Sequence, residues 1–209
     1  MKHSLITIFL LYSLSITAQT PHSIASAYGN LDKDTAKEKV EVVDIDSVEE
    51  RGFIRELRIF KKDNNEWKLW YSSGNAIMAS GEGGVRGDPF QGIEIKKGIL
   101  LIYHEGGSSW MWSHTHKYRF QNSDFYLIGV SNSFGKNGEH WETLDYNLLT
   151  GNAVVTLEDQ AWGDNDEIIV TKKSTDNFNA KQNVLISLKD ISIGNQSIFS
   201  PKTKGEYHF

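Results

Sequence analysis

Residues 99–131, ILLIYHEGGSSWMWSHTHKYRFQNSDFYLIGVS, decide the fold class of this chain. They contain three runs rich in branched aliphatic and aromatic residues, at Ile99–His104, Trp110–Gln121 and Phe125–Ser131. Short links of Gly, Ser, Asn and Asp separate these runs, and such a pattern is typical of β-strands and turns. Because links this short join neighbouring strands as hairpins, we predict an antiparallel meander.

The same pattern continues on both sides of this stretch. Further candidate strands are Val40–Ile45, Phe53–Lys61, Trp67–Ser72, Gly92–Lys96, Trp141–Leu148, Ala153–Leu157, Ile168–Lys172 and Val184–Leu188. The chain has only three prolines and no convincing amphipathic helical stripe. We therefore predict an all-β fold, an antiparallel meander of about ten or more short strands, arranged as a sandwich, a roll or a partial propeller.

The N-terminus has the pattern of a removable signal peptide. Lys2 and His3 give a basic start, Leu5–Leu14 is an apolar run, and Ala18 is a small residue at the expected cut. The run is too short to span a bilayer, which needs about 20 apolar residues. We predict a signal peptide at residues 1–18 and one β-rich domain at 19–209. The protein is expected to be bacterial and exported, either periplasmic or extracellular.

Composition excludes several classes of protein. The chain has no cysteine, which rules out both disulfides and a lipid-attachment cysteine. It carries 22 basic and 27 acidic residues without a basic patch, so no nucleic-acid partner is expected. No second apolar run approaches membrane length, so we expect no stable membrane insertion once the signal peptide is removed.

A glycine-rich loop at residues 73–92 interrupts the strand pattern. A loop this long within a compact domain is usually functional or mobile, and its composition equally suits a disordered connector. Its glycines are not followed by the Gly-Lys-Ser/Thr of a phosphate-binding loop. The sequence therefore leaves two alternatives open, a functional or mobile loop and a disordered connector.

An acidic loop near the start, residues 30–38 (NLDKDTAKE), is a candidate metal site. Oxygen-bearing side chains stand at its first, third, fifth and ninth positions, in Asn30, Asp32, Asp34 and Glu38. A tight turn brings such alternate side chains together, with a backbone carbonyl at the seventh position completing the shell. Calcium is the metal that an oxygen-only set suits best.

This loop resembles the calcium loop of integrin-type FG-GAP repeats, also called VCBS repeats. The resemblance implies side-chain ligands at the four positions named above and a carbonyl ligand from Ala36. Three positions differ from the family pattern: Asn30 replaces the leading acid, Thr35 replaces a glycine, and Glu38 is longer than the usual Asp. The alternative is a polar turn in which the Asp and Asn side chains cap the backbone.

The run from Trp110 to Gln121 alternates in character. One face of a strand here carries six aromatic or histidine side chains, Trp110, Trp112, His114, His116, Tyr118 and Phe120. A core face is one interpretation. A transition-metal site is another, with His114 and His116 joined by His104 or Glu105. A third is a platform for sugar rings or other apolar faces, and on that interpretation the candidate ligand-binding residues are Trp110, Trp112, Tyr118 and Trp141.

The stretch from Asp88 to Gly151 also resembles a set of exported bacterial β-rich proteins that have no assigned activity. The resemblance covers about a third of the chain. It implies export and a β-rich fold, and it implies no chemistry.

We expect a non-enzymatic exported binding or structural module, stabilised by calcium, whose partner is an unknown protein or glycan. The alternative is a hydrolase of polysaccharide or cell-envelope material, using carboxylates among Glu82, Glu105, Glu139 and Glu142. The chain has no Gly-x-Ser-x-Gly elbow and no thiol nucleophile. A concave pocket joining two carboxylates with solvent-exposed tryptophans favours the enzyme, whereas a buried aromatic face without a cleft favours the binding module.

Overall fold

The computed structural model describes residues 21–209. The predicted signal peptide, residues 1–18, lies outside this range. Among the described residues, no helix combines the length and apolar character that crossing a bilayer requires. The single helical element in that range is a short 3-10 turn, η1 (Gly84–Arg86).

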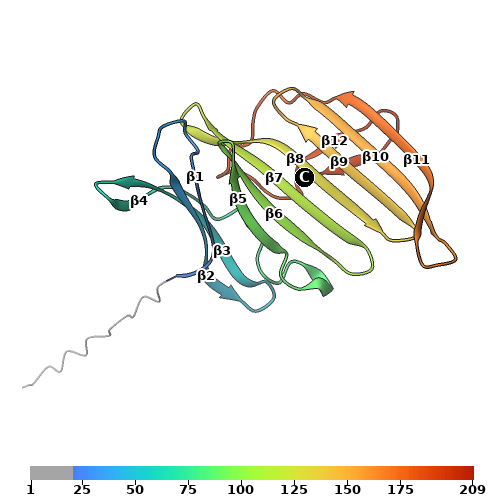
Figure 1. Ribbon diagram of the computed structural model, residues 1–209, viewed down its shortest axis with the longest axis horizontal. Helices are drawn as coiled ribbons and strands as arrows, with labels where there is room; N and C mark the ends of the chain where they lie inside the picture. Colours follow the sequence, from blue (N-terminus) through green and yellow to red (C-terminus); the bar gives the residue numbers. More distant parts are fainter. Residues whose placement is uncertain (1–20) are drawn as a thin grey trace, which may run out of the picture.

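Two antiparallel sheets and a C-terminal hairpin make up the fold (Figure 1). The four-stranded sheet consists, in spatial order, of β1 (His22–Gly29), β2 (Glu38–Val48), β3 (Gly52–Asp63) and β4 (Glu66–Ser73). The seven-stranded sheet consists of β5 (Phe90–Lys96), β6 (Ile99–Gly107), β7 (Met111–Gln121), β8 (Asp124–Lys136), β9 (His140–Asn147), β10 (Asn152–Trp162) and β11 (Ile168–Asn179). The hairpin pairs β12 (Ser197–Phe199) with β13 (Glu206–His208).

Within each sheet every strand pairs with its neighbour in sequence, so the predicted all-β antiparallel meander is confirmed. Tight turns set this topology. The central residues of the β3–β4, β5–β6 and β7–β8 turns have positive φ, as in Asn64 (49°), Lys97 (53°) and Asn122 (50°). Turns with positive φ at both central residues match the right-handed twist of paired strands and therefore favour two-residue hairpins.

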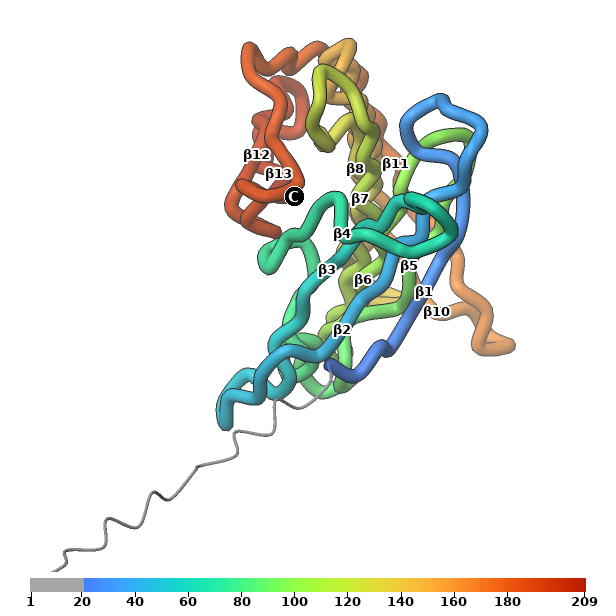
Figure 2. The backbone as a smooth tube through the Cα atoms, turned by 90° about the vertical axis from the view of Figure 1, so that its left-hand side faces the viewer, coloured from blue at the N-terminus to red at the C-terminus, as the bar shows by residue number. Residues whose placement is uncertain are grey.

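One face of the seven-stranded sheet, the inner face, is covered, and the opposite outer face is open. Figure 2 shows the C-terminal segment lying beside β7 and β8 on one side of that sheet. The two sheets meet where β1 passes β5, and a side chain at Gly29 would overlap Ile95. The inner face is thus enclosed by the four-stranded sheet, the connector before β5 and the C-terminal segment.

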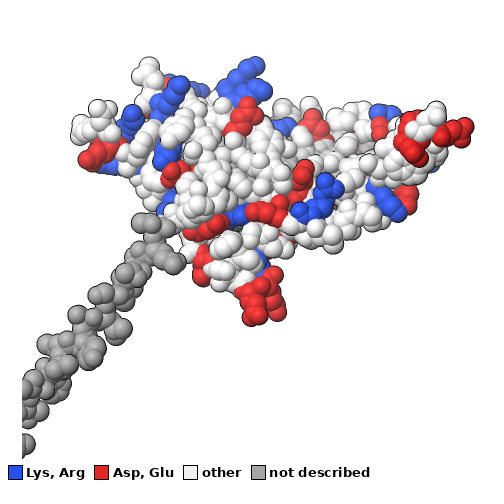
Figure 3. Space-filling view, turned by 60° about the horizontal axis from the view of Figure 1, so that its bottom comes forward, with Lys and Arg blue, Asp and Glu red and all other residues white. Residues whose placement is uncertain are grey.

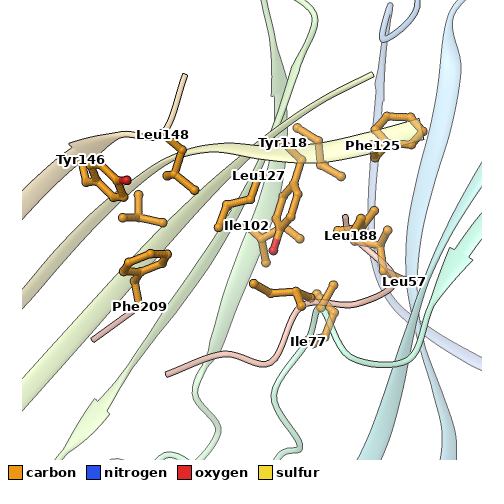
Figure 4. Close-up of a cluster of buried hydrophobic side chains, with 14 of the residues drawn as sticks. Leu57, Ile77, Ile102, Tyr118, Phe125, Leu127, Tyr146, Leu148, Leu188 and Phe209 are labelled. Atoms are coloured by element: carbon orange, nitrogen blue, oxygen red, sulfur yellow. The ribbon is translucent and has the colours of Figure 1, made fainter. Parts of the chain in front are cut away.

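Both sheets and the C-terminal segment share one hydrophobic core (Figure 4). Leu57 from the four-stranded sheet, Tyr118 and Leu127 from the seven-stranded sheet, and Phe209 from the C-terminal segment are all fully buried. The aromatic rings of Tyr146 and Phe209 meet edge to face at 5.5 Å. Burial of this apolar area holds the C-terminal segment against the inner face.

Three strands were not anticipated from the sequence, and one predicted strand is absent. The missed strands are β1, β12 and β13. The predicted strand Val184–Leu188 forms a single bridge between Ser187 and Tyr126 instead. This segment lies along the start of β8, which β9 does not reach, and the Leu127 N–H donates to the Ile186 carbonyl. That position against the sheet accounts for its apolar residues.

The glycine-rich loop at 73–92 is a packed connector between the two sheets. Ala76, Ile77 and Ala79 are buried. The Phe53 N–H donates to the Ser80 hydroxyl at 2.8 Å, which fastens the connector to β3. Of the two alternatives left open by the sequence, a disordered connector does not describe this segment.

Candidate functional site

A pocket of about 500 Å³ lies between the inner face and the segments that cover it. Strands β7, β8 and β9 form its floor, the connector before β5 contributes Met78 and Glu82 to its side, and the C-terminal segment forms its roof. Clefts of this size are typical of small-molecule sites. We call this space the inner pocket.

Strand register builds the floor in two rows. Trp112, Phe134 and Glu142 are register partners across β7, β8 and β9 and form the first row. His114, Asn132 and Leu144 form the second row on the same three strands. Since residues two apart on a strand share a face, the alternation predicted for β7 places Trp112 and His114 together in the pocket floor.

The absence of a side chain at Gly106 lets Trp112 lie flat against the sheet. Gly106 pairs with Trp112 across β6 and β7, and any side chain at that position would overlap the indole ring. Trp110, just before β7, stacks on Phe134 with ring centroids 5.3 Å apart. The floor therefore presents flat aromatic surfaces.

The roof is fixed to the floor by polar as well as apolar contacts. The Asn132 side-chain amide donates to the His208 carbonyl at 2.9 Å. Tyr207 and Ile193 face the pocket from the same segment, beside the core contact of Phe209. The floor and the roof of the pocket thus come from segments at least 49 positions apart in sequence (193 − 144).

The charged side chains that line the inner pocket are carboxylates. Glu82, Glu142 and Glu206 line it, and no Lys or Arg does so among the described residues. Glu82 is neutralised by Arg51 at 2.6 Å and accepts the Ala79 N–H at 2.9 Å. Glu206 accepts a hydrogen bond from a serine hydroxyl, Ser197, at 2.5 Å.

Glu142 differs from the other two carboxylates. Within residues 21–209 it makes no hydrogen bond or ion pair with another side chain. Burial raises the pKa of the Glu142 carboxyl, and the nearby His140 lowers it by a smaller amount.

Three histidines lie on the inner face beneath and beside the pocket. His104 and His116 are each 1% exposed, and His114 stands opposite His104 across the β6–β7 pair. Burial, with a smaller contribution from the neighbouring His114, lowers the pKa of His104 and of His116 to about 3. The His104 Nε2 accepts the Met78 N–H at 3.2 Å, which requires a neutral ring.

The histidines do not converge on a metal. Within the described chain, one group of three potential ligands brings its ligand atoms within 4.8 Å of one another, and that group is Asp32, Asp34 and Glu38. Glu105, offered by the sequence as a further ligand, is exposed beyond His104 on the outer face of β6. A closed transition-metal site needs three or four convergent ligands, and this arrangement does not supply them.

The structure separates the four aromatic candidates for ligand binding. Trp112 lines the inner pocket, and Trp110 lies at its edge through the stack on Phe134. Tyr118 is fully buried in the core. Trp141 lies on the outer face, where its ring covers Gly135 and its N–H donates to the Asn137 side chain at 3.0 Å.

The acidic loop at residues 30–38 lies between β1 and β2. Its three carboxylates converge, as the spacing predicted. The other two expected ligands, Asn30 and Ala36, are hydrogen-bonded to each other. Asn30 donates its side-chain N–H to the Ala36 carbonyl at 3.2 Å. The Ala36 N–H donates to Asp34 at 2.7 Å, and the Asp34 N–H donates to Asp32 at 3.1 Å. Backbone capping, the alternative interpretation, therefore occurs beside the convergence.

A lysine that was not anticipated lies among these carboxylates. The Lys61 ammonium, from β3, forms an ion pair with Asp32 and lies 3.6 Å from Asp34. Glu38 is fully buried, accepts the Leu31 N–H at 2.6 Å through one oxygen, and leaves its other oxygen without a partner. Burial raises the pKa of Glu38. Desolvation acts in the same direction on Asp32, but the hydrogen bond and ion pair with Lys61 and the hydrogen bonding with Asp34 together outweigh it and lower the pKa of Asp32.

Most of the pocket lining was missed because it comes from distant positions. Phe134, Glu206 and Tyr207 carry no local motif, and only their placement by register and by the C-terminal hairpin makes them neighbours. Glu142 was named among possible hydrolase carboxylates, and its position two residues before the buried Leu144 was the available signal that it faces inward.

Known proteins offer no template for this site. No protein-family model, no curated protein and no solved structure matches the chain. The inner pocket and the acidic loop must therefore be interpreted from their own geometry.

Proposed function

We propose that this protein is an exported, non-enzymatic module that binds a small ligand in the inner pocket. The observation that supports this proposal is the pocket itself, about 500 Å³ between three strands and the C-terminal segment. Its walls combine aromatic and aliphatic surface with a few polar groups, which is the usual composition of small-molecule sites. The proposal of export rests on the N-terminal sequence pattern and on the resemblance of the stretch from Asp88 to Gly151 to exported bacterial proteins.

A filled pocket tests this proposal. Replacing Met78→Trp puts a larger side chain at the pocket wall, so we expect saturable binding of N-phenyl-1-naphthylamine, a neutral apolar fluorescent probe, to weaken at least tenfold. Fluorescence titration of the purified protein measures this. Met111→Trp is the matched control, because Met111 lies on the outer face of β7, and binding should be unchanged. Absence of saturable binding to the wild type would overturn the proposal.

A hydrolase is the second candidate, because the pocket brings carboxylates together with a tryptophan. Glu142, with its raised pKa, has the property of a general acid. Glycoside hydrolysis needs a second carboxylate at a defined distance from the first. The other two lining carboxylates are engaged, Glu82 by Arg51 and Glu206 by the Ser197 hydroxyl, which does not favour either as the partner of Glu142. Release of reducing sugar from polysaccharides or peptidoglycan, abolished by Glu142→Gln, would establish this candidate and displace the first.

We also propose that the acidic loop binds calcium, which would stabilise the β1–β2 connection. Three carboxylates converge there, and the buried oxygen of Glu38 lacks a partner. Lys61 supplies a single positive charge against these three negative ones, which leaves the cluster with a formal charge of −2 (−3 + 1). Oxygen-rich anionic loops of this kind suit Ca²⁺, whose coordination number and geometry are flexible.

A further inference from the structure

We infer that the ligand of the inner pocket is an amphipathic organic cation, an amine or quaternary ammonium compound that carries an apolar group. This inference rests on the proposed ligand-binding function. The pocket combines flat aromatic surfaces with three carboxylates, two of which lack a basic partner, and no Lys or Arg lines it among the described positions.

The charge of the pocket favours a cationic ligand. Of the three lining carboxylates, only Glu82 has a basic partner, and that partner, Arg51, is itself mostly exposed. Glu142 has no partner among the described residues, and Glu206 is held only by a neutral serine hydroxyl. A partly buried carboxylate without a counter-charge is costly, because the charged form loses hydration without a replacement interaction. A ligand ammonium beside Glu142 would supply that interaction.

The aromatic surfaces of the pocket also favour a cation. Phe134 is the register partner of Glu142, and Trp112 lies one strand further along the same row, so a cation attracted by the carboxylate is beside one aromatic ring and on the same floor as a second. Ring faces carry negative electrostatic potential and attract cations, particularly quaternary ammonium groups. The remaining wall, formed by Met78, Leu144 and Ile193, is apolar and suits a hydrocarbon portion of the ligand.

Other ligand classes fit the pocket less well. An anion would meet three carboxylates, with no Lys or Arg to hold it, and burial lowers the pKa of the lining His114 and so disfavours its charged form. A bare metal ion would need convergent ligands, and among residues 21–209 the pocket carboxylates and histidines do not form such a group. A neutral apolar ligand would use the aromatic surfaces but would leave Glu142 unpaired.

A matched set of three probes tests the inference. (2-Naphthylmethyl)trimethylammonium, 2-naphthylmethanol and 2-naphthalenesulfonate share an aromatic body and differ in charge. Isothermal titration calorimetry should give binding about tenfold tighter for the cation than for the neutral alcohol, and no detectable binding of the sulfonate. Glu142→Gln, which preserves shape and removes the charge, should reduce cation binding to the level of the alcohol.

Controls separate this inference from the proposed function. Glu105→Gln removes one carboxylate from the outer face and should leave the cation preference intact, which excludes an effect of net charge alone. Equal binding of cation and alcohol, both weakened by Met78→Trp, would overturn the inference and leave the proposed function standing. If none of the three probes and no neutral dye binds, both proposals fail.

Discussion

The histidines of the inner face and Asp32 of the acidic loop differ in charge state. The surroundings of the histidines favour the neutral form, and those of Asp32 favour the charged form. On the inner face, His104 and His116 are kept neutral, because burial lowers their pKa to about 3. In the loop, Asp32 is kept charged, because Lys61 and backbone N–H groups hold its pKa below the usual value. At the histidines desolvation sets the direction of the shift, whereas at Asp32 the ion pair with Lys61 and the hydrogen bonds together outweigh it.

This difference predicts which region responds to which change in solution. The inner face should be sensitive to acid near neutral pH, since a proton taken up there cannot be compensated. The loop should be sensitive to cations and to the loss of Lys61, since its charges are already present. Mutations can break this contrast in either region.

Acid destabilisation should be the largest effect. A histidine with a folded pKa of about 3 and an ordinary unfolded pKa contributes stability that is complete above pH 6.5 and is lost as pH falls towards 3. At pH 5 the loss is about 2 kcal/mol for each such histidine. His116→Leu should therefore flatten the fall in melting temperature between pH 7.5 and pH 5, measured by circular dichroism.

His22→Leu is the control for this prediction, because His22 is exposed on β1. It should leave the pH dependence unchanged. The range above pH 5 also avoids the titration of Asp32, whose lowered pKa places the loss of its stabilising charge below about pH 4. An identical acid response in the wild type and in His116→Leu would show that this imidazole is not held neutral.

Calcium should have the next largest effect, on the loop alone. With an affinity in the range of extracellular calcium modules, 5 mM Ca²⁺ should stabilise the protein by about 1–2 kcal/mol. Asp32→Asn together with Asp34→Asn should abolish the rise in melting temperature. Lys61→Met should lower stability in EDTA and enlarge the response to calcium, because the metal no longer competes with the ammonium.

The control for the loop is Asp63→Asn, which removes a carboxylate from the neighbouring β3–β4 hairpin that pairs with Lys68. Its calcium response should equal that of the wild type. A wild-type protein with no calcium-dependent shift would refute the calcium proposal, and the loop would then be a turn closed by Lys61.

Glu142→Gln should have the smallest effect, and it should be stabilising. The raised pKa of Glu142 means that its ionised form is disfavoured by folding, so it favours the folded state at low pH and opposes it at neutral pH. Removing the charge should increase the free energy of unfolding at pH 7.5 by about 0.5 kcal/mol, measured by urea denaturation. A decrease would mean that Glu142 has a stabilising partner in the unliganded protein.

The sequence predicted the meander well because strand signals are local. Alternating apolar residues and turn pairs such as Lys97-Gly98 act over a few positions, and the structure places strands at ten of the eleven predicted segments. The strand β1 was missed because HSIASAYG lacks a strong apolar alternation. It becomes a strand by pairing with the valine-rich β2, and that pairing is not visible in the residues of β1 alone.

The inner pocket was predictable only in part. The alternation in β7 correctly placed Trp112 and His114 on one face, and that same argument grouped Tyr118 with them although it lies deeper in the core. Along β7, the C-terminal segment determines which inward-facing side chains line the pocket and which are buried in the core. No local pattern shows that Tyr207 packs over β8 and β9.

The division of the pocket between floor and roof has a consequence for biosynthesis. The floor residues end at Leu144, and the first roof residue is Ile193, 49 positions later (193 − 144). At synthesis rates of about 5–20 residues per second, the aromatic floor precedes its cover by several seconds. During this interval Trp112 and Phe134 lack the cover that the roof residues provide, and on the proposed function a ligand would be retained only after that cover has docked.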